Sequence, residues 1–139
     1  MTWLHWSLLS ALFAAITAVL AKIGVKGIDP NLATGIRTIV VAILTWGIVA
    51  ATPKAASIAS VSKSAWMFLI LSGLATGLSW ICYFHALQAG PLTRVAPVDK
   101  LSIAVTMLLG VLLLGESVTL RAGFGALLIV AGVVTIAME

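Results

Sequence analysis

Three charged residues lie within segments that are otherwise apolar, namely Arg37, Asp99 and Lys100. A charge near the bilayer centre costs at least about 2.5 kcal/mol, and residues of this kind typically mark a substrate or ion pathway. With a helical rise of about 1.5 Å per residue, Arg37 lies roughly 9 Å and Asp99 roughly 12 Å below the same membrane surface. The similar depths predict that Arg37 and Asp99 pair across two helices, with Lys100 turned about 100° away toward the pathway or an interface.

Uncharged polar side chains extend this prediction. Polar residues three or four positions apart share one face of a helix, and such a face usually turns away from lipid. Four of the expected helices carry a polar face, whereas the last has only Thr135 in its interior. Four helices would therefore surround a pathway, and the fifth would lie outside it. The predicted pathway residues, besides the three charges, are Lys22, Thr76, Ser79, Trp80, Tyr83, Ser102 and Thr106.

Each of these uncharged or peripheral candidates also has a plainer interpretation. Hydroxyl groups in membrane helices can bond to their own backbone or hold helices together. Lys22 can be an interfacial anchor whose ammonium group reaches the lipid headgroups, and Trp80 can be a packing residue. Both interpretations stay open at this point.

Pro97 is predicted to kink the helix that carries Asp99 and Lys100. A proline inside a helix leaves the carbonyl four residues earlier, here that of Thr93, without its usual donor. Transporters often build substrate sites from such broken helices. The alternative is that this helix starts at Pro97, which would place Asp99 and Lys100 among the lipid headgroups.

The composition of the chain identifies the solvent that must surround these residues. The 139 residues are 62% hydrophobic and only 9% charged, with a mean hydropathy of +1.21, whereas about a quarter of a globular domain is charged. This excludes a soluble enzyme, a disordered tail and a disulfide scaffold. The net charge of +4 comes from scattered basic residues rather than a cluster, so no nucleic-acid partner is expected.

Apolar stretches between charges and helix breakers predict an all-α, multi-pass membrane protein with one domain over residues 1–139. A spanning helix needs about 20 mostly apolar residues. The five expected spans are residues 3–24, 31–51, 65–87, 91–114 and 118–138. Four of the five tryptophans then fall at one membrane surface, where indole rings are favoured; they are Trp3, Trp6, Trp46 and Trp66.

The basic residues barely favour one orientation over the other. The tryptophan-rich surface holds Lys54, Lys63 and Arg121. The opposite surface holds Lys22, Lys26 and Arg94, with Arg37 and Lys100 deeper on the same side. Since a clear excess of Lys and Arg is needed to set orientation, the chain is expected either to insert both ways or to depend on a partner or on this small excess.

Sequence patterns for catalysis and for bound cofactors are missing. The chain has no GxxxxGK[ST] loop for ATP, no HExxH and no paired cysteines for zinc. Ser79 and His85 are six residues apart on one helix and point in different directions, so they are not expected to act as a hydrolytic pair. We therefore expect a protein that is not an enzyme and needs no cofactor or metal.

Several short motifs, in order, resemble a known family. They are Lys22, Pro30 and Arg37, the run Tyr83-Phe84-His85-Ala86-Leu87, then Pro97-Val98, Leu114-Gly115-Glu116, Gly125 and Ala131-Gly132-Val133. Together they resemble the EamA domain of the drug/metabolite transporter superfamily over nearly the whole chain. The resemblance implies secondary transport of small metabolites, often amino acids or related compounds, with the first four helices lining a cavity and the fifth outside it.

Many members of that family have ten helices arranged as two inverted five-helix repeats, whereas this chain has one repeat. The resemblance therefore implies an antiparallel homodimer in the cell membrane, in contact with lipid and with a small-molecule substrate. We expect alternating-access transport of a small polar metabolite, and the basic excess favours an anionic or zwitterionic one. The alternatives are an exporter like the small multidrug resistance proteins, although the first helix lacks their glutamate, and a non-transporting subunit or half of a lipid flippase.

Overall fold

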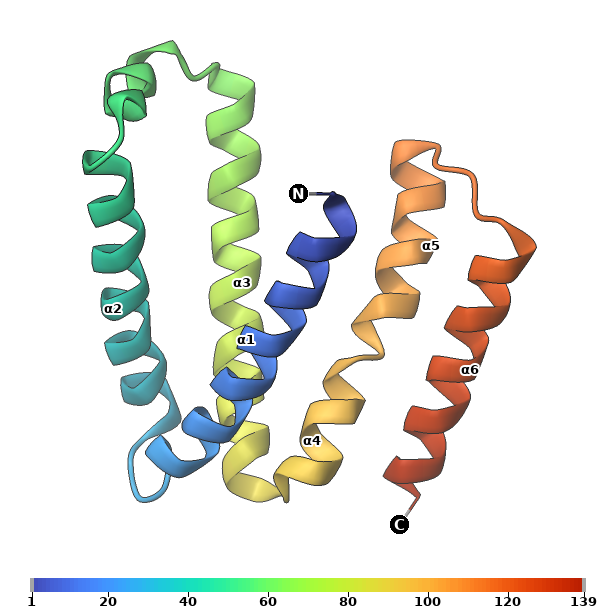
Figure 1. Cartoon of the computed structure of the whole chain (residues 1–139). Coiled ribbons are helices and arrows are strands. Elements are labelled where there is room, and N and C mark those ends of the chain that lie inside the picture. The colour runs from blue at the N-terminus through green and yellow to red at the C-terminus, as the bar shows by residue number, and fades with distance from the viewer. Residues whose placement is uncertain (1, 139) are drawn as a thin grey trace. The chain divides into compact units, whose positions relative to one another are not determined.

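The computed structural model describes residues 2–138; the side chains of residues 54–56 lie outside the description, and with them the predicted interfacial charge Lys54. Over the described residues, five helical segments are long and apolar enough to cross a membrane, which confirms the predicted class. The helices are α1 (Trp3–Gly24), α2 (Pro30–Ala50), the 3-10 helix η1 (Pro53–Ser60), α3 (Lys63–Ala89), α4 (Leu92–Asp99), α5 (Ser102–Leu114) and α6 (Leu120–Ala137) (Figure 1).

The helices group into two compact units. One comprises residues 19–89, and we refer to it as the α2–α3 unit. The other comprises residues 1–18 and 90–139, and we refer to it as the α4–α6 unit. Helix α1 contributes its last turns to the first unit and the rest to the second.

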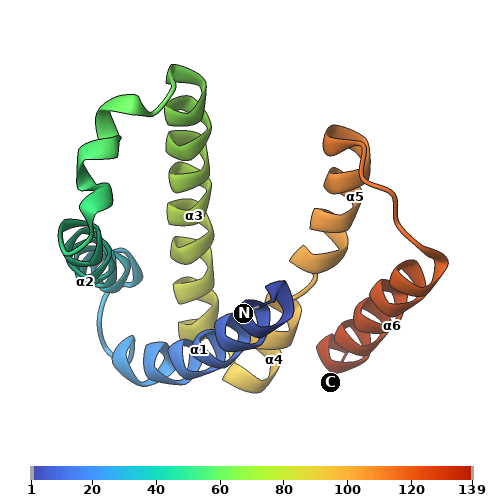
Figure 2. The same cartoon turned by 45° about the horizontal axis from the view of Figure 1, so that its top comes forward.

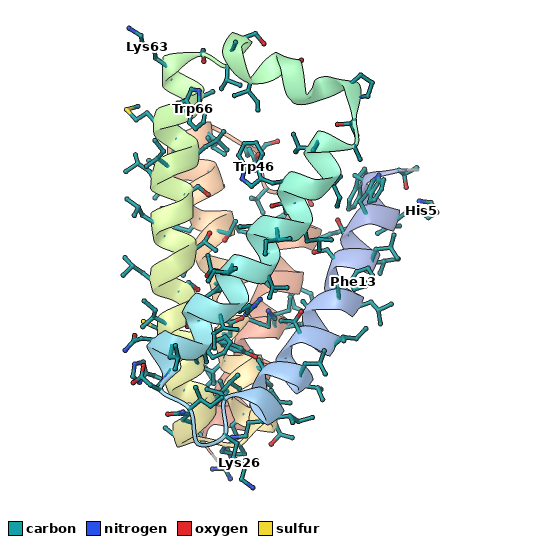
Figure 3. The ribbon with its side chains drawn as sticks, turned by 90° about the vertical axis from the view of Figure 1, so that its left-hand side faces the viewer. His5, Phe13, Lys26, Trp46, Lys63 and Trp66 are labelled. Atoms are coloured by element: carbon teal, nitrogen blue, oxygen red, sulfur yellow. The ribbon has the colours of Figure 1, made fainter. Side chains whose placement is uncertain are left out.

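In the α2–α3 unit, the two long helices pack against each other. They run in opposite directions, and η1 connects their ends (Figures 1 and 2). Trp46, Lys63 and Trp66 lie at the end near η1, whereas Lys26 lies at the other end (Figure 3). Within this unit, the two tryptophans therefore share one end, as an interfacial position requires.

The packed core of the α2–α3 unit lies at the end opposite η1. Here the turn between α1 and α2 meets the last turns of α3. The buried side chains include Pro30 together with Val25, Thr34, Phe84 and Leu87, which are at most 5% exposed. The turn closes through Gly27, whose φ of +77° favours glycine. Asp29 then caps α2 by accepting the N–H groups of Asn31 and Leu32 at 2.9 and 3.1 Å, an interaction that stabilises a helix start.

In the α4–α6 unit, the predicted fourth span forms as two helices, α4 and α5, that together cover residues 92–114. Pro97 lies inside α4, so the helix does not start there. The interruption comes one turn later, at Lys100 and Leu101, whose N–H groups donate to carbonyls three residues back at 2.9 and 3.0 Å. Figure 1 shows the chain changing direction between α4 and α5.

The connection between α5 and α6 is short and well defined. Gly115 ends α5 with a φ of +67°, a left-handed conformation that commonly terminates helices. The side chain of Thr119 caps α6 by accepting the N–H of Ala122 at 3.2 Å. Both α4 and α5 contact α6, and Figure 2 shows the extended link before α6. The buried residues of this unit are Gly110 and Val133.

Candidate functional site

The structure brings the predicted intramembrane cation onto a pair of aromatic rings. The Cζ atom of Arg37 lies 4.1 Å from the centroid of the Trp80 ring and 5.7 Å from that of the Phe84 ring. We call these two rings the aromatic ledge. A guanidinium over an indole face gains about 1–2 kcal/mol, with the larger value where water is excluded. The ledge thereby offsets part of the cost of placing a charge inside the membrane.

The spacing of the two ring residues in the sequence explains why they form one surface. Trp80 and Phe84 are four residues apart on α3 and so share one face, and α2 packs against α3. Tyr83, next to Phe84, lies within electrostatic range of Arg37. Three predicted pathway residues therefore lie together, and Phe84 joins them although sequence reasoning did not select it. A phenylalanine in an apolar helix carries no signal of its own beyond its four-residue spacing from Trp80.

The charge of Arg37 has no counter-ion within its own unit. Residues 19–89 contain one acidic side chain, Asp29, whose Oδ1 atom caps the start of α2, eight residues before Arg37. The predicted pair between Arg37 and Asp99 joins residues of the two units and stays a prediction.

A second polar cluster holds the packed end of the α2–α3 unit together. The ammonium of Lys22 donates to the carbonyl of Leu87, and the side-chain amide of Gln88 donates to the carbonyls of Val25 and Ile28. We call these bonds the clasp. They satisfy carbonyls at the end of α3 and in the turn after α1, groups that helix ends leave without partners. Lys22 thus has a structural task, and Gln88 was not selected from the sequence because it sits in a predicted loop.

The clasp borders an open pocket of about 770 Å³. Its lining comes from the end of α1, the turn before α2 and the end of α3, and consists of Lys22, Val25, Lys26, Gly27, Ile28, Asp29, Pro30, Leu87 and Gln88. The pocket lies at the same end of the unit as Lys26 (Figure 3). Because its polar side chains are largely used by the clasp and the helix cap, we assign it no ligand.

Most threonines of the predicted polar faces bond to their own helix. Thr76 donates its hydroxyl to the carbonyl of Ser72 at 2.9 Å. The same i to i−4 bond is made by Thr34, Thr38, Thr45 and Thr135. The plainer interpretation thus describes these threonines well. By contrast, no hydroxyl bond to a protein group is found for Ser79, Ser102 or Thr106 among residues 2–138.

In the α4–α6 unit, the two predicted charges pair locally. The ammonium of Lys100 lies 3.0 Å from the carboxylate of Asp99. Lys100 therefore turns back toward its neighbour rather than away from it. The pair is partly exposed, at 51% for Lys100 and 37% for Asp99, and it sits at the interruption between α4 and α5, next to Ser102. Thr106 lies one turn further along α5.

The predicted residues thus form two groups. The α2–α3 unit holds Arg37, Trp80 and Tyr83 together, with Lys22 in the clasp and with Thr76 and Ser79 further along α3 toward η1. The α4–α6 unit holds Pro97, Asp99, Lys100, Ser102 and Thr106 around the interrupted span.

Comparison with known proteins identifies the family of this chain. A model of the EamA-like transporter family matches residues 1–138. The chain belongs to the EamA-like transporter family. A Sinorhizobium sp protein described as an "Uncharacterized transporter in cobO 3'region" is 48% identical over 137 residues, covering 99% of this chain and 97% of that protein. No solved structure gives a significant match. The EamA resemblance seen in the sequence is confirmed, and the protein is an integral membrane protein with a transporter role.

Proposed function

We propose that this EamA-family protein is a secondary transporter that moves a small polar metabolite across the cell membrane by alternating access. The observation that carries the proposal is the position of Arg37. This cation lies in a helix long and apolar enough to cross a membrane, and within its unit it contacts two aromatic rings rather than an acidic side chain. A charge kept there at a cost is expected to serve the cargo. Membership of a transporter family over residues 1–138 supports the same function.

The interrupted fourth span supports alternating access. Helices α4 and α5 meet at Lys100 and Leu101, next to the Asp99–Lys100 pair. An interrupted helix can change direction at the break while both segments stay intact, and transporters use such breaks near polar groups. Pro97, which removes one backbone donor from α4, makes a break in this turn less costly.

We further propose that the working form is an antiparallel homodimer. Five spans place the two ends of the chain on opposite sides of the membrane, so a second copy must be inverted to form a pair of inverted repeats. The near balance of Lys and Arg between the two surfaces favours insertion in both orientations. Ideal Cβ atoms built at Gly125 and Gly132 meet nothing within 4 Å, so α6 offers an open seam for close helix packing.

Transport is tested in proteoliposomes that contain the purified protein and a mixture of radiolabelled amino acids and small organic acids. The proposal expects protein-dependent release of at least one solute down an imposed ion or solute gradient. Protein-free liposomes are the control. If no solute moves faster than in the control under any gradient, the transporter proposal is wrong.

Orientation is tested with two reporters, one active only in the cytoplasm and one active only outside it, fused in turn to each end of the chain. Signals from both reporters at both ends support the antiparallel homodimer. A single orientation contradicts its simplest form, and it does so without affecting the transport measurement.

A further inference from the structure

We propose that Arg37 on its aromatic ledge recognises one carboxylate group of the transported metabolite. The statement that this carboxylate belongs to a transported molecule rests on the proposed function. The statement that Arg37 binds a carboxylate is independent of it. The inference narrows the substrate from a small polar metabolite to a small organic acid or amino acid. It assigns Phe84 and Trp80 the task of positioning the guanidinium.

The geometry leaves the right donors available. The Cζ atom of Arg37 lies 4.1 Å from the centroid of the Trp80 ring and 5.7 Å from that of the Phe84 ring, and the guanidinium group carries five N–H donors. Two of these N–H groups can bond in parallel to the two oxygens of a carboxylate. Contact with the two rings restricts the guanidinium before a ligand binds, which lowers the entropy lost on binding. Arg37 is only half-buried, so a solute can reach it.

The charge of the unit favours an anion. Asp29 is the only acidic residue among residues 19–89; its Oδ1 atom accepts two backbone N–H groups at the start of α2, and it precedes Arg37 by eight residues, roughly 12 Å along the helix. An anionic ligand would therefore be the counter-ion that this unit does not itself offer to Arg37. In the low dielectric of a membrane protein, such a charge-assisted bond is worth more than it is in water.

The surroundings of Arg37 suit one carboxylate better than a phosphate. Arg37 is the only Lys or Arg of α2, and the only one of α3 is Lys63, although α3 also carries His85. Lys63 precedes Trp80 by 17 residues on α3, which places it roughly 25 Å away along the helix. A phosphate group carries nearly two charges and is usually met by several cations or a helix start. A single guanidinium matches a monoanion.

Binding is tested with Trp80 as the only fluorescent reporter. The other four tryptophans, Trp3, Trp6, Trp46 and Trp66, are all exposed and are replaced by phenylalanine. The probes are N-acetylglycine and its amide, which have nearly the same shape and differ in charge. Titration of the purified full chain in detergent should change Trp80 emission with the acid and leave it unchanged with the amide.

Two arginine variants separate the site from general charge effects. Arg37→Gln should weaken N-acetylglycine binding by at least about tenfold, and Arg37→Lys should also weaken it because an ammonium cannot bond in parallel to both oxygens. Arg94→Gln makes the same change in net charge at an exposed position and should leave binding unchanged. Equal responses to acid and amide, no response to either, or a response that survives Arg37→Gln in a protein of normal helicity would each overturn the inference.

The proteoliposome assay distinguishes this inference from the proposed function. Carboxylate binding without any transport would overturn the transporter proposal and keep the site. Transport that is equally fast for an acid and its amide, or that is unchanged by Arg37→Gln, would overturn the site and keep the transporter proposal. Transport restricted to carboxylates and reduced at least about tenfold by Arg37→Gln would support both.

Discussion

The two units of the chain differ sharply in how they hold charge. The α2–α3 unit has five basic residues and one acidic residue, whereas the α4–α6 unit has three of each. The whole net charge of +4 therefore belongs to the α2–α3 unit. There, the intramembrane cation rests on rings, while in the α4–α6 unit the intramembrane cation has a carboxylate next to it in the sequence.

The units also differ in packing. The α2–α3 unit buries Phe84 and Leu87 and ties its end with side-chain bonds between distant residues. Among its described residues, the α4–α6 unit buries Gly110 and Val133, and its side-chain hydrogen bonds given above join residues close in the sequence. The better packed, positively charged unit and the unit with the interrupted span are different parts of the chain, which suits a recognition site in the first and movement in the second.

The largest effect should come from removing the buried ring of the ledge. Phe84 is 4% exposed, so Phe84→Ala should lower the free energy of unfolding by at least about 2 kcal/mol through lost packing. Unfolding by denaturant in mixed micelles measures the change. Phe68→Ala, on the same helix at 63% exposure, is the matched control and should change stability by less than about 0.5 kcal/mol. Equal losses would show that the packed end of the unit is not special.

Removing the amide of the clasp should have an intermediate effect. Gln88→Ala removes the side-chain donor to the carbonyls of Val25 and Ile28, of which the Val25 carbonyl keeps the N–H of Ile28 at 3.2 Å; the loss should cost about 1–3 kcal/mol of unfolding free energy. Lys26→Ala, an exposed change in the same turn, should cost less than about 0.5 kcal/mol. The same unfolding experiment decides, and a Gln88→Ala protein as stable as the Lys26→Ala protein would contradict the clasp.

The local ion pair of the α4–α6 unit should contribute less. Asp99 and Lys100 are partly exposed, so a double-mutant cycle with Asp99→Asn and Lys100→Gln should give a coupling below about 1 kcal/mol. A cycle with Asp99→Asn and Arg37→Gln tests the predicted pair across the two units, and independence of these two changes would contradict that pair. A coupling of several kcal/mol between Asp99 and Lys100 would instead mean that their pair is buried in the working protein.

The smallest effect is expected where α5 ends. An added Cβ at Gly110 would lie 2.9 Å from the Oε2 atom of Glu116, the far end of a side chain that can rotate away. Gly110→Ala should therefore change stability by less than about 1 kcal/mol, since alanine favours a helix by a similar amount. In a Glu116→Ala background, the same change should stabilise the protein. Destabilisation in both backgrounds would show that another group approaches Gly110.

The sequence predicted the spans well because lipid imposes a simple rule on length and hydropathy. The α1 bounds agree with the predicted 3–24, and α2 starts at Pro30, one residue before the prediction. α3 runs two residues further at each end than 65–87, and α6 starts at Leu120 rather than at residue 118. The connection predicted over residues 52–64 contains η1, which sequence reasoning missed because the side chains described for this short 3-10 helix, those of residues 53 and 57–60, are exposed and form no apolar pattern.

The site was less predictable, because contacts between helices depend on rotation that hydropathy does not encode. Arg37, Trp80 and Tyr83 were selected from charge and polarity, and the structure brings them together. Phe84 and Gln88 were missed because their importance comes from what lies opposite them on other segments. The break lies at Lys100 and Leu101, one turn after Pro97. Its position depends on which carbonyl groups accept the N–H groups of these two residues, and a proline in the sequence does not specify that.

An arginine that rests on rings keeps its full positive charge, and this makes the site sensitive to voltage. Moving one charge through a membrane potential of 100 mV changes the energy by about 2.3 kcal/mol. If Arg37 binds a monoanionic acid as proposed, the two charges cancel and the loaded site feels almost none of this force. The membrane potential would then act differently on the empty and on the acid-loaded forms of the proposed carrier.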